Sequence, residues 1–278
     1  MMQPKNKNWL TVLFITLTAL SPYIKSNLWR WWYNILARYD KDARLLLMNY
    51  GYADPTTPHM DLHPEDEHYR YPIQLYHYVI RGIDLANKNV LEVGSGRGGG
   101  ASYIARYHRP HTMLGVDYSE ANIAWCQRYF NVENLHFRGG RAEQLPCKNE
   151  SMDIIINVES SHCYKDMAGF IREVIRVLRP GGYFSFCDLR TLQGANELKA
   201  LFTASGLKII DYHDISEHVL QALDLVHRER SAATAQKVPK LLRSSFGDFI
   251  GLKGTAVYKM LSKGEMIYVA YIMRKRET

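Results

Sequence analysis

The chain has 278 residues, of which 46% are hydrophobic and 23% charged, a composition that argues against disordered and low-complexity classes. That length is enough for one α/β domain or two small domains. The net charge of +7 comes from basic residues scattered along the chain, which indicates a solvated surface and not a nucleic-acid interface. The four cysteines form no Cys-x-x-Cys pair, so we predict neither a zinc site nor a disulfide framework and expect a reducing, cytoplasmic setting.

The first 28 residues differ from the rest of the chain. Lys5 and Lys7 precede an uncharged run from Trp9 to Leu20, and four of the five tryptophans lie before residue 33. As a helix the run would be about 18 Å long, whereas a hydrocarbon core is about 30 Å thick, so a full span is marginal. Because tryptophan rings beside cations favour the membrane–water interface, we predict that residues 1–28 anchor the protein to the cytosolic face of a membrane. The alternatives are a helix packed on the protein, a cleaved signal and a true span.

From residue 89 onward, short apolar runs alternate with helical stretches. The predicted strands cover Asn89–Val93, Met113–Val116, Leu135–Phe137, Met152–Val158, Tyr183–Cys187, Lys208–Tyr212 and Glu265–Met273. Strands that alternate with helices predict right-handed crossovers and a parallel, doubly wound sheet covered on both faces. A further helix is expected over residues 216–242. Because we find no internal repeat and no long linker, we predict one domain over residues 29–278.

A glycine-rich turn follows the first predicted strand. Residues 90–100 read VLEVGSGRGGG, an apolar strand that runs into glycines and then into a helix. Glycines let a ligand approach the backbone at the carboxyl edge of such a sheet. Asp117, at the end of the next strand, lies 23 positions after Gly94 and is placed to bind a ribose diol. Glu92 would repel a pyrophosphate but suits a sulfonium ligand with an ammonium group, which favours S-adenosyl-L-methionine (SAM) over a dinucleotide.

These residues and three later motifs resemble the motifs of class I SAM-dependent methyltransferases. The motifs are LEVGSGRGG at 91–99, GVDY at 115–118, AEQLP at 142–146 and LRPGG at 178–182. The segments MNYGYA at 48–53, NVESSHCY at 157–164 and FIG at 249–251, the last followed by Gly254 and Thr255, resemble a narrower branch. That branch contains the phthiotriolone and phenolphthiotriolone dimycocerosate methyltransferases, which are lipid O-methyltransferases. The resemblance runs from about Trp29 to the C-terminus and implies a Rossmann-like seven-stranded doubly wound sheet. It also implies helical cap segments over the active site at about 29–80 and 215–262.

The resemblance implies a SAM site at the carboxyl edge of the sheet. The implied cofactor-binding residues are Glu92, Gly94, Ser95, Gly96, Asp117, Tyr118, Ala142, Glu143 and Asn157. The glycine turn would pack under the methionine part of SAM, Asp117 would hold the ribose and Tyr118 would cover the adenine. The sequence departs from the family at Arg141, where an aspartate usually accepts a hydrogen bond from the adenine amino group. Arginine has no acceptor, so either Glu143 or a backbone carbonyl takes over, or the adenine contacts are weaker than usual.

The chemistry is expected just after the predicted strand that ends near Asn157. Methyl transfer from a sulfonium needs an aligned nucleophile and the removal of one proton. His162 suits the second task, because an imidazole has an ordinary pKa of about 6.5 and its loop faces the ligand crevice. The alternatives for His162 are acceptor contact without proton transfer and a purely structural role. Glu159 could orient the imidazole or help to bind the acceptor, and Tyr164 could contact the acceptor.

The acceptor is predicted to be lipophilic, because the cap segments are aromatic or apolar in parts. Candidates for the lining are Tyr50, Tyr52, Tyr76 and Tyr164, although a stripe of aromatics more often belongs to a core. No metal site is predicted, because His59, His63 and His68 share no helical spacing. We therefore predict a SAM-dependent O-methyltransferase that acts on a hydroxyl of a lipid, polyketide or phenolic molecule. The alternatives are C- or N-methylation of a quinone, sterol or amine, a catalytically silent SAM-binding regulatory subunit, and a dinucleotide oxidoreductase.

Overall fold

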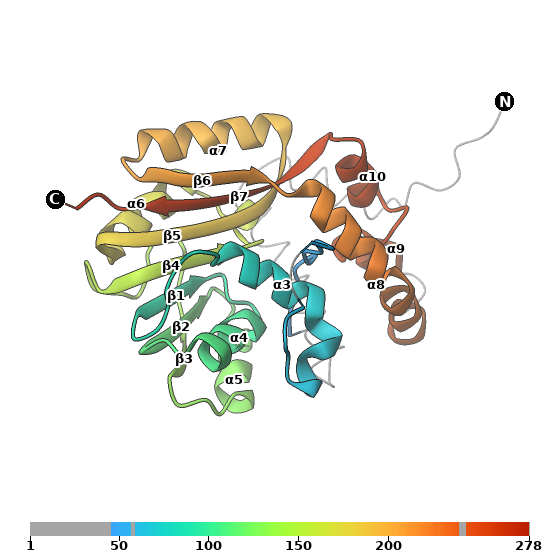
Figure 1. Cartoon of the computed structure of the whole chain (residues 1–278), viewed down its shortest axis with the longest axis horizontal. Coiled ribbons are helices and arrows are strands. Elements are labelled where there is room, and N and C mark those ends of the chain that lie inside the picture. The colour runs from blue at the N-terminus through green and yellow to red at the C-terminus, as the bar shows by residue number, and fades with distance from the viewer. Residues whose placement is uncertain (1–45, 57–58, 239–242, 278) are drawn as a thin grey trace.

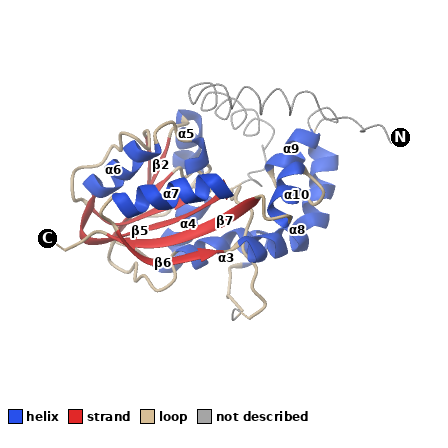
Figure 2. Ribbon diagram, turned by 90° about the horizontal axis from the view of Figure 1, so that it is seen from above, coloured by secondary structure: helices blue, strands red, loops and turns tan. Residues whose placement is uncertain are grey.

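The computed structural model describes residues 46–56, 59–238 and 243–277, and its centre is a seven-stranded sheet (Figures 1 and 2). The strands are β1 (Asn89–Val93), β2 (Thr112–Asp117), β3 (Leu135–Gly139), β4 (Met152–Val158), β5 (Leu178–Thr191), β6 (Lys208–Asp214) and β7 (Met266–Arg274). Their order in the sheet is β3-β2-β1-β4-β5-β7-β6. This confirms the predicted doubly wound α/β fold.

The sheet is parallel except at β7, whose direction the sequence pattern did not predict. β1 to β5 pair in parallel, but β7 runs antiparallel to both of its neighbours, β5 and β6. An alternation of strands and helices predicts crossovers between parallel strands, and the first six strands follow this pattern. β7 follows helices that lie beyond the end of the sheet, so it enters from that end and runs back between β5 and β6 (Figure 1).

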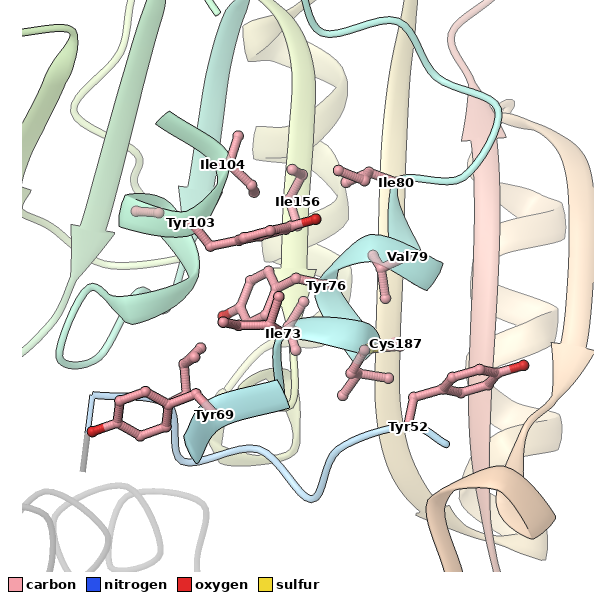
Figure 3. Close-up of a cluster of buried hydrophobic side chains, with 14 of the residues drawn as sticks. Tyr52, Tyr69, Ile73, Tyr76, Val79, Ile80, Tyr103, Ile104, Ile156 and Cys187 are labelled. Carbon is pink, nitrogen blue, oxygen red and sulfur yellow. The ribbon is translucent and has the colours of Figure 1, made fainter. Parts of the chain in front are cut away.

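Helices cover both faces of the sheet. One face carries α3 (Arg70–Val79), α4 (Gly99–His108) and α5 (Glu120–Tyr129), and the other carries α6 (Met167–Val177) and α7 (Leu192–Ala204). Alternate residues of each central strand supply the two cores, as the two-residue period of a strand requires. In β4, Ile154 and Ile156 face the first cluster, part of which Figure 3 shows, whereas Ile155 faces the second.

Further elements lie at the end of the sheet where the parallel strands finish. They are α8 (Ser216–Lys237), α9 (Arg243–Phe249) and α10 (Ala256–Ser262), together with the short turns η1 (Pro64–Tyr69) and η2 (Ser161–Cys163). The helix expected over 216–242 thus ends at Lys237. Residues 46–56 run close by, since Tyr52 N donates to Tyr71 O at 3.0 Å and Ala53 N donates to His218 O at 3.1 Å. Segments from both ends of the chain therefore lie next to the carboxyl edge.

None of the helices in the described ranges is long and apolar enough to cross a membrane. The anchor predicted for residues 1–28, and the part of the first cap segment before residue 46, lie outside the described residues. The anchor therefore stays a prediction.

Candidate active site

The turn after β1 is held to the neighbouring strand through its backbone. Gly94 N and Ser95 N both donate to Val116 O, at 2.8 and 3.0 Å. Gly94 has φ of 79°, and a Cβ added there would lie 2.4 Å from Ser160 Oγ. Both the left-handed backbone and the close approach of the segment after β4 therefore require glycine at this position.

Asp117 is fixed against the same turn. Its Oδ2 accepts from Gly96 N at 2.9 Å, and its Oδ1 accepts from Ser119 N at 2.8 Å. Burial raises the pKa of this carboxyl group, although the backbone donors oppose the rise. The glycine turn and the carboxylate at the end of β2 are thus brought together, as the sequence predicted for a ribose site.

Glu92 lies on β1 just before the turn and is fully buried. Its Oε1 accepts a hydrogen bond of 2.5 Å from the hydroxyl of Tyr76, while its Oε2 has no hydrogen-bond partner among the described residues. Burial raises the pKa of Glu92 to about 7; the Tyr76 hydroxyl opposes this rise and the charge of Asp117 adds to it. A cation bound beside Glu92 would therefore stabilise its ionised carboxylate.

Asn157 is the second-last residue of β4 and faces the turn. Its Nδ2 lies 2.9 Å from Val93 O, 2.9 Å from Ser160 Oγ and 2.8 Å from the hydroxyl of Tyr164. Its Oδ1 and the hydroxyl of Ser95 are both buried and have no hydrogen-bond partner among residues 46–56, 59–238 and 243–277.

Three buried oxygens around one glycine turn, Glu92 Oε2, Ser95 Oγ and Asn157 Oδ1, therefore have no donor in the part of the chain that the structure describes. Buried polar groups are nearly always satisfied, so unsatisfied acceptors indicate a place for a ligand that carries donors. The ammonium group of SAM offers donors of this kind. The residues present fit the methionine part of SAM.

Arg141 departs from the family pattern and lies on the side expected for the adenine. Its guanidinium is 5.2 Å from the ring centre of Tyr118, and its Nε is 3.8 Å from Glu143 Oε2. The other oxygen of Glu143 accepts from Lys165 N at 3.1 Å, and Ala142 between the pair is buried. Arg141 therefore lies beside the acid that the sequence offered as a substitute acceptor, and beside the predicted adenine cover.

His162 lies in η2 and is held by Asp188, which lies on the neighbouring strand β5. His162 Nδ1 is 2.8 Å from Asp188 Oδ1, and the backbone N–H of His162 donates to Asp188 Oδ2 at 2.9 Å. Asp188 is fully buried and also receives the hydroxyl of Ser161 at 2.6 Å and the guanidinium of Arg190 at 2.9 Å. The imidazole is thus fixed by a carboxylate that is itself fully engaged.

These charges move the pKa values of both partners. Burial disfavours the imidazolium, but Cys163 and Asp188 outweigh that effect and raise the pKa of His162 well above 6.5. Burial also disfavours an ionised Asp188, yet Arg190, His162 and Ser161 together lower its pKa. Asp188 is therefore ionised at neutral pH and stabilises a protonated His162.

The carboxylate of Glu159 accepts hydrogen bonds from two segments that are distant in the sequence, and its role in orienting the imidazole stays a prediction. Its Oε2 accepts from Tyr50 N and from the hydroxyl of Tyr268, both at 2.9 Å. Its backbone has φ of 48°, in the left-handed region that is uncommon for a residue with a side chain. Burial raises the pKa of Glu159 to about 7. Glu159 connects residues 46–56 and β7 to the end of β4.

The four tyrosines proposed as acceptor lining lie in different places. Tyr76 donates to Glu92, and Tyr164 lies against the glycine turn, so both are on the cofactor side. Tyr50 is buried beside Glu159. Tyr52 is buried and stacks on Tyr78, with ring centres 4.4 Å apart. The sequence pattern could not separate these positions, because all four side chains are largely buried aromatics.

Sequence reasoning missed three contributors, Asp188, Ser160 and the hydroxyl of Tyr268. Asp188 carried a signal, since it is a single acid in the apolar run 183–189 that forms part of β5, near the edge where ligands bind. Ser160 and Tyr268 carried no such signal, because Ser160 bonds Val93 O and Tyr268 bonds Glu159, both across distant segments of the chain.

Comparison with known proteins identifies relatives along most of the chain. A family model described as a methyltransferase domain matches residues 91–186. The phthiotriol/phenolphthiotriol dimycocerosates methyltransferase of Mycobacterium tuberculosis is 36% identical over 247 residues, which cover 89% of this chain and 92% of the relative. The fatty-acid O-methyltransferase of Mycolicibacterium smegmatis is also 36% identical, over 87% of this chain and 88% of the relative.

Solved structures with the same fold include other methyltransferases. A putative sarcosine dimethylglycine methyltransferase from Galdieria sulphuraria matches with a TM-score of 0.67 and 14% identity, over 83% of this chain and 94% of that one. The geranyl diphosphate C-methyltransferase of Streptomyces coelicolor, solved with S-adenosyl-L-homocysteine, matches with a TM-score of 0.63 and 17% identity, over 87% and 97%. The sheet, the glycine turn and these relatives together identify the family. The chain belongs to the class I SAM-dependent methyltransferases, in the branch of the phthiotriol/phenolphthiotriol dimycocerosates methyltransferases, and SAM is its cofactor.

Proposed function

We propose that this enzyme methylates a hydroxyl of a lipophilic small molecule and that His162 is the general base. The observation that carries the proposal is the bond between His162 Nδ1 and the buried, ionised Asp188. Two relatives support the substrate class, since their names describe methyltransferases of dimycocerosates and of a fatty acid.

In this proposal Asp188 fixes the tautomer of the His162 imidazole. With the Nδ1 proton donated to Asp188, the basic nitrogen is Nε2, which removes the proton of the acceptor hydroxyl as its oxygen attacks. The SAM sulfonium supplies the methyl group, so an O–C bond forms as an S–C bond breaks. Asp188 stabilises the imidazolium that results. Because the pKa of His162 is raised, the rate should increase as the pH rises through that pKa and the imidazole loses its proton.

Around the cofactor, Glu92, Asn157 and the turn at Gly94 hold the methionine part, and Asp117 holds the ribose. Two acids near one another suit a ligand that carries positive charge. Around the acceptor, residues 46–56 and the helices α8 to α10 form the cover. Arg230 of α8 supports this arrangement, because it donates to Asn49 O at 3.3 Å and to Ile250 O at 3.2 Å and so joins both cap segments.

The direct test uses purified enzyme, methyl-labelled SAM and a lipid extract. Label is expected in an ether or ester of a hydroxylated fraction, and NMR of the new methyl distinguishes O- from C- or N-methylation. His162→Ala should lower the rate by about 10²- to 10⁴-fold, as loss of a general base does, with SAM affinity unchanged. His59→Ala is the control, because the side chain of His59 is 75% exposed and lies in a loop.

A different result would support another function. Absence of label in every hydroxylated fraction contradicts O-methylation. Tight SAM binding by calorimetry with no turnover, and no response to His162→Ala, would indicate a SAM-binding regulatory subunit instead.

For the N-terminal segment we propose contact with the cytosolic face of a membrane, supported by the apolar run and the tryptophan cluster of the sequence. Deletion of residues 1–28 should release the protein from liposomes while SAM affinity stays the same. If the shortened protein remains on the liposomes, the anchor lies elsewhere.

A further inference from the structure

Tyr76 of α3 joins a helix that precedes the sheet to a residue of the proposed cofactor site. Its hydroxyl donates to Glu92 Oε1, 16 residues further along the chain, and its ring is 6% exposed. Figure 3 shows Tyr76 in the buried cluster with Tyr103, Ile104 and Ile156, which belong to α4 and β4. The phenol therefore reaches Glu92 from inside the core and not from a solvent-facing loop.

The neighbouring helix α4 is shaped to accept this ring. A Cβ added at Gly100 would lie 1.9 Å from Tyr76 Cζ and 2.3 Å from its hydroxyl oxygen. Any side chain in this first turn of α4 would displace the phenol from Glu92. The third glycine of the run 98–100 thus makes room for Tyr76.

Tyr76 is the one side-chain donor to Glu92 among the described residues. Within those residues the other oxygen of Glu92 has no hydrogen-bond partner, and Glu92 forms no ion pair. Burial disfavours its charge; the hydrogen bond from Tyr76 opposes that effect most, and the backbone of Ala101 opposes it to a smaller extent. A hydrogen bond to one oxygen of a carboxylate also restricts its rotation, and so determines where the second oxygen lies.

We propose that Tyr76 is a positioning residue for the cofactor: its hydroxyl holds Oε1 of Glu92 so that Oε2 meets the ammonium group of SAM. The inference rests on the proposed placement of Glu92 beside the methionine part. It reassigns Tyr76 from the acceptor, for which the sequence suggested it, to cofactor binding.

The test compares two probes that differ in this ammonium group. S-adenosylhomocysteine carries the amino-acid part, whereas 5′-methylthioadenosine lacks it. In calorimetry on the full chain at pH 7.5, Tyr76→Phe should weaken S-adenosylhomocysteine binding by roughly ten-fold, the usual effect of a hydrogen bond to a charged group, and leave methylthioadenosine binding unchanged. Tyr103→Phe is the matched control, because it removes a buried hydroxyl of the same cluster that contacts only His77 and His108 among the described residues.

A double-mutant cycle separates the inference from the placement of Glu92. Glu92→Gln should also weaken only S-adenosylhomocysteine, and Tyr76→Phe should add nothing in that background, since the two residues act as a unit. If Glu92→Gln leaves both affinities unchanged, the proposed placement of Glu92 fails. If Glu92→Gln weakens the first probe but Tyr76→Phe weakens both probes equally, weakens neither, or adds its full effect to Glu92→Gln, the positioning role is overturned.

The pH dependence of binding gives a second readout. It does not depend on how much of each variant is folded, because each variant is compared only with itself at different pH values. In the unaltered enzyme, S-adenosylhomocysteine affinity should fall as the pH drops through about 7, where Glu92 takes up a proton, and methylthioadenosine affinity should stay level. Tyr76→Phe should move that midpoint to higher pH. A midpoint that does not move contradicts the proposal.

Discussion

The glycine turn after β1 and the segment after β4 form neighbouring parts of one site, but they are built differently. The turn is fixed by its own backbone and by the adjacent strand, through bonds from Gly94 and Gly96 to the end of β2. The segment after β4 is fixed by side chains of distant origin: Glu159 is bonded to residues 109 positions away in both directions along the chain. The half proposed to bind the cofactor is therefore encoded in short runs of sequence, whereas the half proposed to perform the chemistry exists only in the complete fold.

The two parts also differ in how their acids are held. Asp188 has five donors, including the backbone N–H of Leu189, and its pKa is lowered. Glu92 has one side-chain donor, and burial raises its pKa to about 7. Asp188, beside the proposed base, is thus ionised before any ligand binds, whereas a cationic ligand would stabilise the ionised form of Glu92. Three substitutions test the contrast between the glycine turn and the segment after β4.

The largest effect is expected for Asp188→Asn. An amide can no longer stabilise the imidazolium, so turnover should fall by about 10²- to 10⁴-fold while SAM affinity stays within a few-fold. The lost charge should also lower the pKa of His162 and move the acid limb of the rate profile to lower pH. Asp153→Asn serves as control, because Asp153 binds Asn89 N and Arg179 near the start of β4, away from the site. Normal turnover in Asp188→Asn would refute the assigned role.

A smaller effect is expected for Gly94→Ala, measured as SAM affinity and as the midpoint of thermal unfolding. The left-handed backbone and the 2.4 Å approach of Ser160 Oγ should together cost about 1 to 3 kcal/mol of stability or cofactor binding. Gly264→Ala is the matched control, since Gly264 has φ of 70° but open space around its missing Cβ. Equal losses in the two variants would mean that only backbone strain matters at the turn.

The smallest effect is expected for Glu159→Gln, and it concerns stability. Because the pKa of Glu159 is raised from 4.5 to about 7, its contribution to stability is complete below pH 4.5 and is lost as the pH rises through 7. Glutamine keeps an acceptor for Tyr50 and Tyr268 without the charge. The unfolding free energy of the variant, relative to that of the native enzyme, should therefore rise by about 2 kcal/mol between pH 5 and pH 8.

Urea unfolding at the two pH values measures this difference. Glu150→Gln is a suitable control, because Glu150 has the same φ of 48° but a side chain that is 56% exposed. A pH-independent difference between Glu159→Gln and the native enzyme would show that Glu159 does not titrate in this range.

The sequence predicted the cofactor half better than the other half for a physical reason. A glycine turn, the strand before it and the acid at the end of the next strand are local patterns, and the structure brings Glu92, Gly94 and Asp117 together as expected. The bond between His162 and Asp188 depends on which strands are neighbours in the sheet, which no local pattern states. The antiparallel direction of β7 has the same cause, since apolar alternation gives a strand no direction.

The position of β7 bears on how the protein is made. Six strands and eight α-helices of the described chain precede it, yet it lies between β5 and β6 and supplies the hydrogen bonds that join them. During synthesis, β6 therefore has no place in the sheet until residues 266–274 have left the ribosome. We expect the nascent chain to expose an unpaired edge of β5 until then, and to need protection from aggregation during that interval.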